Sequence, residues 1–425
     1  MWNLTCAHVV PNVDYLSFAI ESWDRLFGCR KAIMTRLARR HKLLLNGPPH
    51  YPRDIFHDGN RSEANGIIRR TDNFYTLTSN LHFRSERVPG LTRISKNYHI
   101  HKVRRALEKL KFGPLALVIW QPEFVDMLGN FGEQVSCYYV YDNFVDYVGQ
   151  DEEERRHIEE DESRMLRMVD IVFTTGAGLF QAKNRYGNAV NVPNGVDFDL
   201  FSRALSPDTP IPADLSAIPE PRLGYVGTLN EKVNLELIEE IAARRPGWSF
   251  VFIGPEKLTL DAGIERFQSL RKRSNFYFLD RRPENELPGY FRGLDIGLMP
   301  YNLHSWAYFA SPLKLHEYLA AGKPVISAPI PSAGQFRQVI SMAHDPGEWI
   351  AAVEDALAHN DRETRAERVA VARANDWNTR IELIETTIAN KIAEKQYVGK
   401  DLVDHTVGGV ESSGPHATSA YGGVR

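Results

Sequence analysis

The chain has 425 residues, of which 43% are hydrophobic and 25% charged, and its formal net charge at pH 7 is −3. This length and composition are typical of a globular protein with two hydrophobic cores. The small negative charge excludes a general electrostatic attraction to nucleic acid, so we expect no nucleic-acid partner.

The three cysteines, Cys6, Cys29 and Cys137, are widely spaced and form no CxxC pattern. This usage argues against a disulfide framework or a zinc site and favours a reducing compartment. The N-terminal stretch MWNLTCAHVVPNVDYLSF has no basic segment before an apolar core, and no later apolar run reaches the ~18 residues that span a bilayer. We therefore expect a cytoplasmic protein.

Short β-rich runs alternate with helical patterns through the first half of the chain. Such alternation is typical of a parallel sheet with crossover helices, and it predicts a first Rossmann-like domain over residues 1–201. The predicted strands are KLLLNG (42–47), LALVIWQ (115–121), VSCYYVY (135–141), DIVFTTG (170–176) and AVNVPNG (189–195).

The stretch SRALSPDTPIPADLSAIPEP (202–221) contains five prolines, which preclude a continuous helix or a central strand, so it predicts a linker. A second α/β series over 222–375 predicts another doubly wound domain. Its predicted elements are strands in LGYVGTL (223–229), SFVFIGP (249–255), NFYFLD (275–280), LDIGLMPY (294–301) and PVISAP (324–329), and helices over 234–245 and from 311. Residues 376–396 predict a further helix, and the Gly-, Ser- and Thr-rich composition that follows predicts a disordered tail over 397–425.

The segment SPLKLHEYLAAGKP (311–324) places a lysine at the start of a helix, beside the positive end of its dipole. Ser311 suits the N-cap and Pro312 the first helical position, which puts Lys314 in the first turn. Ligands of open parallel sheets bind beyond the carboxyl ends of the strands, where this helix begins. The N–H groups of Leu313 and Lys314 and the lysine side chain therefore predict an anion site, with a diphosphate as the candidate anion.

Glu317 lies three residues beyond Lys314, on the same helix face, where its carboxylate could accept hydrogen bonds from ribose hydroxyls. The alternative is an ordinary Lys314–Glu317 surface pair worth ~0.2–0.5 kcal/mol.

In GYVGTLNEK, Gly227 permits close approach of a ligand to the backbone at the turn from Thr228 to Lys232, and Lys232 can balance phosphate charge. A tight strand-to-helix turn without a ligand remains the alternative. The pattern is not GxGxxG, which argues against a dinucleotide-dependent dehydrogenase.

Three segments carry a resemblance: GYVGTLNEKVNLELIEEIAARRPGWSFVFIGP (224–255), LPGYFRGLDIGLMPY (287–301) and SPLKLHEYLAAGKPVIS (311–327). They resemble the donor-binding half of GT-B-fold glycosyltransferases of the group 1 type, which use nucleotide sugars. The similarity extends to VPNGVDFDLF (192–201) and to DWNTRIELIETTI (376–388), which resembles the helix that crosses back to the first domain.

The resemblance implies two Rossmann-like domains that face a cleft, with the acceptor bound by the first domain and the donor by the second. Glu317 would hold the ribose, and the diphosphate would lie among a group of residues from both loops. These residues are Ser311, Leu313, Lys314, Gly227, Thr228 and Lys232. Lys232 and Lys314 would stabilise the departing diphosphate, so the implied scheme requires no metal and no cofactor beyond the donor as co-substrate.

One position departs from the family pattern. Many retaining members have a second glutamate eight residues before the ribose glutamate, where this chain has Phe309. A retaining assignment therefore does not carry over, and an inverting transferase needs a general base for the acceptor hydroxyl. Asp142, directly after an apolar strand, is the first candidate and Asp146 the second, although either could be a turn-forming or helix-capping aspartate.

His99 and His101 form an HxH pair, but no acidic or histidine cluster accompanies it, so we predict packed or exposed histidines rather than a metal site. The same stretch is a basic amphipathic helix with Lys102, Arg104, Arg105, Lys109 and Lys111. Such a helix could rest on anionic lipid at the inner face of the membrane, or simply present a solvated face.

The predicted function is transfer of a sugar from a nucleotide sugar to a glycan or lipid-linked saccharide acceptor, as in polysaccharide or glycoconjugate biosynthesis. A nucleotide-sugar 2-epimerase of the same fold, or a non-catalytic relative that binds glycan or nucleotide, are the alternatives. Analysis of the reaction products distinguishes an epimerase from a transferase. Nucleotide binding without turnover in the presence of acceptors would indicate a non-catalytic relative.

Overall fold

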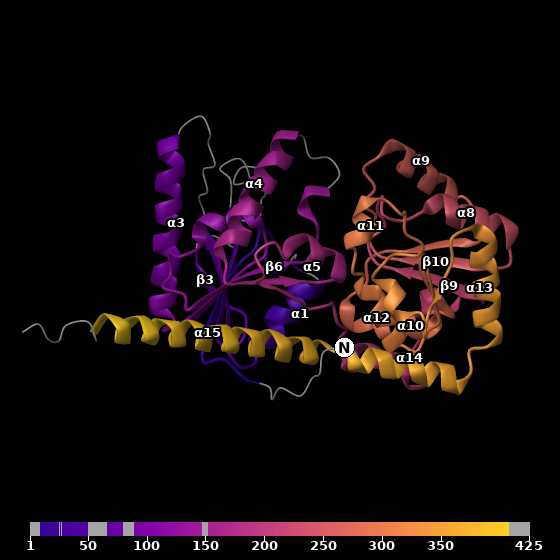
Figure 1. Ribbon diagram of the computed structural model, residues 1–425. Coiled ribbons are helices and arrows are strands. Elements are labelled where there is room, and N and C mark those ends of the chain that lie inside the picture. The colour runs from indigo at the N-terminus through magenta and orange to yellow at the C-terminus, as the bar shows by residue number, and fades with distance from the viewer. Residues whose placement is uncertain are drawn as a thin grey trace, which may run out of the picture.

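The structure is a computed structural model that describes residues 9–24, 26, 28–49, 66–79, 89–146 and 152–407. Its elements form two α/β bodies side by side, and a long C-terminal helix lies along one side of the first body (Figure 1). The predicted fold class is thereby confirmed, with one sheet in each body. Cys6 lies outside the described residues, while Cys29 and Cys137 are buried free thiols.

The first sheet has the strand order β3-β4-β2-β1-β5-β6-β7-β8, and every neighbouring pair is parallel except β3 and β4. The predicted strands in this part are confirmed, and β1, β3 and β4 were not predicted. The strands are β1 (Asp14–Phe18), β2 (Leu43–Pro49), β3 (Ile67–Arg69), β4 (Phe74–Ser79), β5 (Leu115–Ile119), β6 (Val135–Val140), β7 (Ile171–Thr174) and β8 (Ala189–Asn191).

Helices cover both faces of this sheet because its central strands are apolar on both sides, as in parallel sheets generally. One buried cluster joins the sheet to α1 (Gly28–Leu37) and to the C-terminal helix, and another joins it to α3, α4 and α5. These last helices span Pro89–Lys109, Glu152–Met168 and Ala177–Lys183, with short 3-10 turns at Pro122–Met127 and Phe144–Asp146.

The second sheet is entirely parallel, with the order β11-β10-β9-β12-β13-β14. From β9 the chain adds strands toward one edge of the sheet (β10, β11), and from β12 it adds them toward the other edge (β13, β14). Ligands of doubly wound sheets bind at such a switch point, here between β9 and β12. The strands are β9 (Arg222–Val226), β10 (Ser249–Ile253), β11 (Phe276–Leu279), β12 (Ile296–Met299), β13 (Val325–Ser327) and β14 (Ser341–Met342).

Helices also lie on both sides of the second sheet (Figure 1). Its core includes Val196, Phe198 and Phe201, which precede the predicted linker at 202–221. The helices are α6 (Phe198–Phe201), α7 (Ala213–Ser216), α8 (Leu235–Arg244), α9 (Asp261–Leu270), α10 (Leu287–Gly293), α11 (Ser305–Phe309), α12 (Leu313–Ala320), α13 (Pro346–Ala358) and α14 (Arg362–Ala374), with 3-10 turns at Ser202–Leu205, Glu284–Glu286 and Ala333–Phe336.

The chain passes between the two bodies twice, and the two passages are bonded to each other. Val196 N donates to Asn375 O (3.1 Å), and Trp377 N donates to Val196 O (3.0 Å). From there α15 (Trp377–Val407) returns along the first body. It runs to Val407 rather than to residue 396. The predicted disordered tail is therefore helical over 397–407, and residues 408–425 lie outside the described part.

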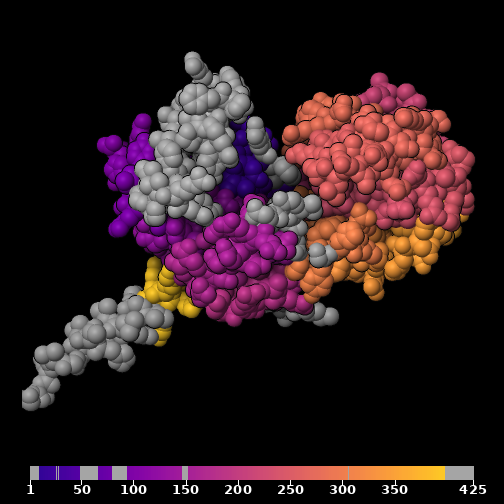
Figure 2. Space-filling model, turned by 90° about the horizontal axis from the view of Figure 1, so that it is seen from above, coloured from indigo at the N-terminus to yellow at the C-terminus, as the bar shows by residue number. Residues whose placement is uncertain are grey.

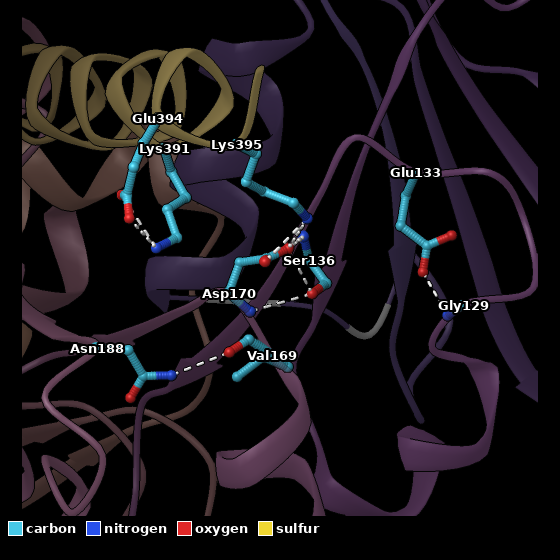
Figure 3. A network of polar contacts seen from close by, with 9 residues as sticks. All are labelled: Gly129, Glu133, Ser136, Val169, Asp170, Asn188, Lys391, Glu394 and Lys395. Carbon is cyan, nitrogen blue, oxygen red and sulfur yellow. Dashed lines mark hydrogen bonds and ion pairs between the residues drawn. The ribbon is translucent and has the colours of Figure 1, made fainter. Parts of the chain in front are cut away.

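Apolar and charged contacts hold α15 on the first body. Trp377, Ile381, Ile384 and Ile388 lie in its core, and the fully buried Glu385 contacts Arg40 (3.1 Å) and His41 (3.0 Å). Near the end of the buried face, Lys395 Nζ lies 2.9 Å from both carboxylate oxygens of Asp170, which also accepts from Ser136 N (2.8 Å) (Figure 3). The helix is thus fixed to the sheet at both ends of its contact.

A hollow separates the two bodies when they are viewed from above, between the indigo surface of the first and the orange surface of the second (Figure 2). It lies on the side away from α15, where the carboxyl ends of the strands carry the connecting loops. Within the described residues, no helix combines the length and the apolar character needed to cross a bilayer.

Candidate functional site

The helix α12 begins one residue later than predicted. Its N-cap is Pro312 (ψ 125°), with no side-chain cap, so the predicted N-cap role of Ser311 is wrong. Pro312 itself has extended backbone, so the first helical residue is Leu313 and Ser311 lies one position before the cap. Instead, its carbonyl oxygen accepts a hydrogen bond from Asn194 Nδ2 of the first body (2.6 Å). The backbone N–H groups of Leu313 and Lys314 remain the first-turn donors of α12.

Lys314 is held by two tyrosines that the sequence analysis did not identify. Its ammonium group donates to Tyr301 Oη (2.8 Å) and Tyr225 Oη (3.1 Å), and it lies 4.3 Å from the ring centre of Tyr225. Burial raises the pKa of Tyr301 to about 12 and that of Tyr225 still further, so both phenols are neutral. These contacts orient the lysine without cancelling its positive charge, as an anion-binding group requires.

Gly227 lies directly against this lysine. Its φ of +140° is a backbone conformation that side chains disfavour, and a Cβ atom there would lie 3.1 Å from Lys314 Nζ. The adjoining Thr228 is fixed by Tyr225, whose hydroxyl donates to the Thr228 carbonyl oxygen (2.9 Å). The structure therefore brings Gly227, Thr228 and Lys314 together beyond the carboxyl ends of β9 and β12.

Glu317 lies one helical turn beyond Lys314 and is only partly exposed. Burial raises its pKa from 4.5 to about 7; the positive charge of Lys314 opposes this shift and Glu284 adds to it. A carboxyl group with this pKa changes charge near neutrality and gains from hydrogen-bond donors such as vicinal hydroxyls.

Asp142 and Lys232 meet across the boundary between the two bodies. Asp142 follows β6 in the first body, and its Oδ2 lies 3.5 Å from Lys232 Nζ, which comes from the loop after β9. The ammonium of Lys232 also lies 4.8 Å from the ring centre of Trp306 in α11. A predicted general base and a predicted diphosphate ligand are therefore direct neighbours. The side chain of Asp146, the second candidate base, lies outside the described part.

Phe309 lies eight residues before Glu317, at the last position of α11. It packs against the buried cluster of the first body that includes residues of α3, α4 and α5. Tyr308 beside it donates from its hydroxyl to Gln181 Oε1 of α5 (2.8 Å). A Cβ atom on Gly178 would lie 2.6 Å from the Tyr308 carbonyl oxygen, so the two helices touch closely. The end of α11 thus serves contact between the bodies.

The two histidines of the HxH pair lie on different sides of α3. His99 is buried against Phe18 and His101 is exposed, since residues two apart on a helix point to different sides. Across the part of the chain that the structure describes, no group of three or more His, Cys, Asp or Glu side chains is arranged to hold a metal ion.

These features place charged side chains of both bodies around the start of α12, and comparisons with known proteins identify the fold. Residues 220–359 match the family "Glycosyl transferases group 1". The chain is 32% identical over 235 residues to a Bacillus subtilis (strain 168) protein named teichuronic acid biosynthesis glycosyltransferase TuaH. That match covers 53% of this chain and 58% of the relative, so the chain spans little more than half the length of the relative it matches.

Solved structures share the whole two-body arrangement at low sequence identity. A sucrose-phosphate synthase from Thermosynechococcus elongatus superposes with a TM-score of 0.65 and 16% identity, over 90% of this chain and 100% of that chain. An E. coli trehalose-6-phosphate structure bound with UDP-2-fluoro glucose superposes with a TM-score of 0.63 and 14% identity, over 89% and 99% of the two chains. The predicted resemblance is confirmed: the fold is GT-B, and the residues that match the group 1 glycosyl transferase family, 220–359, lie in the second body.

Proposed function

We propose that this protein is a glycosyltransferase that moves a sugar from a nucleotide sugar to a hydroxyl of a glycan or glycolipid acceptor, in polysaccharide or glycoconjugate biosynthesis. The observation that carries the proposal is the first turn of α12. There the ammonium of Lys314, held by two neutral phenols, lies one turn from Glu317, within the residues that match the group 1 family. Asp142 of the first body contacts Lys232, which comes from the loop after β9 in the second body.

In this scheme the second body binds the donor. Lys232, Lys314 and the N–H groups of Leu313 and Lys314 neutralise the diphosphate, Gly227 and Thr228 allow it to approach the backbone, and Glu317 accepts from the ribose. Ser311 contributes to the site through its backbone, which Asn194 holds in place by donating a hydrogen bond to the Ser311 carbonyl oxygen. UDP-sugars are the first donors to test, because the similar E. coli structure is bound with UDP-2-fluoro glucose.

The first body supplies the acceptor and the base. Asp142 takes the proton of the acceptor hydroxyl while the oxygen of that hydroxyl forms a bond to the anomeric carbon of the donor sugar. At the same time the bond from the anomeric carbon to the diphosphate oxygen breaks. The diphosphate leaves with the bonding electron pair, which Lys232 and Lys314 stabilise electrostatically. The protein cations take this role in the scheme, so it includes no metal and no cofactor other than the donor.

The test is ligand-observed NMR with UDP-, GDP- and dTDP-sugars on wild type and Glu317→Ala, followed by transfer assays with Asp142→Asn. We expect selective binding that Glu317→Ala removes, and loss of transfer in Asp142→Asn with the donor still bound. If no nucleotide sugar binds, the proposed donor site is wrong. If wild type converts the donor into its epimer without an acceptor, the chain is an epimerase instead.

We also propose that the protein is cytoplasmic and contacts the inner face of the membrane through α3. The outer face of α3 exposes Ile94 (67%) and Tyr98 (50%) one turn apart, beside the exposed Arg93 and Arg105. This pairing of apolar and basic side chains suits an anionic lipid surface. Because α3 runs antiparallel to β4, its N-terminal half, with Arg93, Ile94 and Tyr98, lies toward the carboxyl ends of the strands, where a lipid-linked acceptor would enter.

Two of the basic residues named from the sequence have partners within the protein. Lys102 Nζ donates to Thr78 O (3.2 Å), and Arg104 Nε donates to Asn130 O (2.8 Å).

Sedimentation with anionic phospholipid vesicles tests the proposed contact of α3 with the membrane. Ile94→Glu should reduce binding at least about threefold, since burial of an isoleucine side chain contributes ~1.5–3 kcal/mol when complete. The control Tyr186→Glu should not reduce it, since Tyr186 is about as exposed as Tyr98 but lies outside α3.

A further inference from the structure

A buried ion pair lies behind the loop that carries Asp142. Lys183, the last residue of α5, places its ammonium 2.7 Å from Oε2 of Glu162 in α4, and each side chain is only 8% exposed. The second carboxylate oxygen of Glu162 accepts from the hydroxyl of Tyr138 in β6 (3.1 Å). Both oxygens of this buried carboxylate are therefore satisfied.

Such a pair is costly to bury and contributes little net stability, because desolvation of the two charges offsets their attraction. Well-packed apolar residues in its place are often as stable or more so. What the pair does provide is a fixed geometry. Lys183 is held by Glu162, and its ammonium also donates to Oδ1 of Asn143 (3.1 Å), the residue next to Asp142.

Asn143 passes this constraint to the candidate base. Its backbone N–H donates to Asp142 Oδ1 (2.9 Å), while Asp142 Oδ2 faces Lys232. On the other side of Asp142, the hydroxyl of Tyr141 accepts from Gln121 Nε2 (2.9 Å), and the guanidinium of Arg30 lies 4.5 Å above its ring. Asp142 is therefore flanked by two residues that buried partners hold in place.

We propose that Lys183 is a positioning residue of the transfer reaction: acting through Asn143, it holds the loop after β6 so that Asp142 faces the donor loops of the second body. The proposal rests on the proposed function and specifies how its base is oriented. Small displacements of a reacting group lower the rate by up to ~100-fold, so a residue two contacts away from Asp142 affects catalysis without touching substrate.

Asn143→Ala tests this role because it cuts the link but leaves the Lys183–Glu162 pair intact. We expect kcat to fall at least about tenfold, with the donor KM and the thermal midpoint unchanged. Asn143→Asp keeps an acceptor oxygen for Lys183 and should restore most of the rate. A purely structural pair would show neither the selective loss of kcat nor the rescue.

Lys183→Met alone would leave Glu162 buried without its cation and could unfold the protein. The double variant Lys183→Met/Glu162→Leu removes both charges and retains apolar volume. It should fold and lose kcat as Asn143→Ala does, and adding Asn143→Ala to it should produce no further loss.

Two outcomes overturn the positioning role: an Asn143→Ala enzyme with wild-type kcat, or a rate loss that adds fully to that of the double variant. Failure of the proposed function looks different, because wild type would then bind no UDP-sugar and form no transfer product. That result removes the positioning role as well.

Discussion

The carboxylate of Asp142 and the ammonium of Lys232 lie 3.5 Å apart, although they belong to different sheets and are 90 residues apart in the chain. Both side chains are partly exposed, at 23% and 38%. A donor diphosphate would use the same lysine, so Asp142 and the diphosphate are two anions that compete for one cation.

Asp142→Asn should therefore bind UDP more tightly than wild type. Partly exposed ion pairs contribute up to ~1 kcal/mol, which corresponds to a gain of at most about fivefold. Isothermal titration calorimetry at low salt measures it. In the Lys232→Met background the same substitution should leave the affinity unchanged; an equal gain there would mean that Asp142 merely repels the anion through space.

Glu317 should make donor binding depend on pH. Its pKa is raised to about 7, so the carboxylate that accepts from ribose is formed only as the pH passes through that value. UDP affinity of wild type should rise between pH 6 and pH 8, and Glu317→Gln should lack this part of the rise. Parallel affinity curves for the two proteins would show that Glu317 does not contact the nucleotide.

The same residue should lower stability as the pH rises. The folded protein holds this proton more tightly than the unfolded chain, whose glutamate has a pKa near 4.5. Folding is therefore penalised increasingly from about pH 4.5 to pH 7. Urea unfolding of Glu317→Gln should show a stability advantage over wild type that grows across this window; a constant difference would contradict the raised pKa.

Gly227→Ala should damage both the fold and the donor site. The φ of +140° strains any side chain, which costs ~1–3 kcal/mol, and the new methyl group would lie 3.1 Å from Lys314 Nζ. We expect lower stability in urea and at least about tenfold weaker UDP binding. Gly247→Ala is the matched control, since no atom lies within 4 Å of its added Cβ. Equal effects of the two substitutions would argue against a special role of Gly227.

Phe309→Glu restores the family's second glutamate but should not strengthen donor binding. Phe309 packs on the first body, so a carboxylate there loses apolar contact and is partly desolvated, at a cost of at least ~1 kcal/mol. The thermal midpoint should fall while UDP-sugar affinity stays the same. Tighter UDP-sugar binding by Phe309→Glu would show that position 309 reaches the sugar after all.

Much of the fold could be predicted because buried parallel strands are short apolar runs, as in LALVI and IGLM. The strands DYLSF and FYTLTS escaped prediction because polar residues interrupt them, and only pairing with β2 and β5 makes them strands. The end of α15 was placed too early because the Gly-, Ser- and Thr-rich composition of residues 405–425 indicated a disordered tail, and this tail was extended back to residue 397, although the helix continues to Val407.

The candidate site was predicted where the chemistry lies within one segment, as at Lys314 and Glu317. The phenols that hold Lys314 come from positions 225 and 301, and no local pattern connects them to residue 314. The one indication in the sequence was the position of Tyr301, which comes directly after Pro300 at the end of β12 and therefore at the edge of the sheet where ligands bind. Trp306 and the Asp142–Lys232 contact likewise depend on how the two bodies meet.

The paired passages at Val196 and Asp376 restrict how the two bodies can move. A single connecting segment would allow rotation about its own axis, but two segments bonded to each other oppose such twisting, because it would break the bonds of Val196 to Asn375 and Trp377. Opening of the hollow is thereby confined to bending about one line. Gly195 lies on that line, and a Cβ atom there would come within 2.8 Å of Asn375 O and spread the two segments apart.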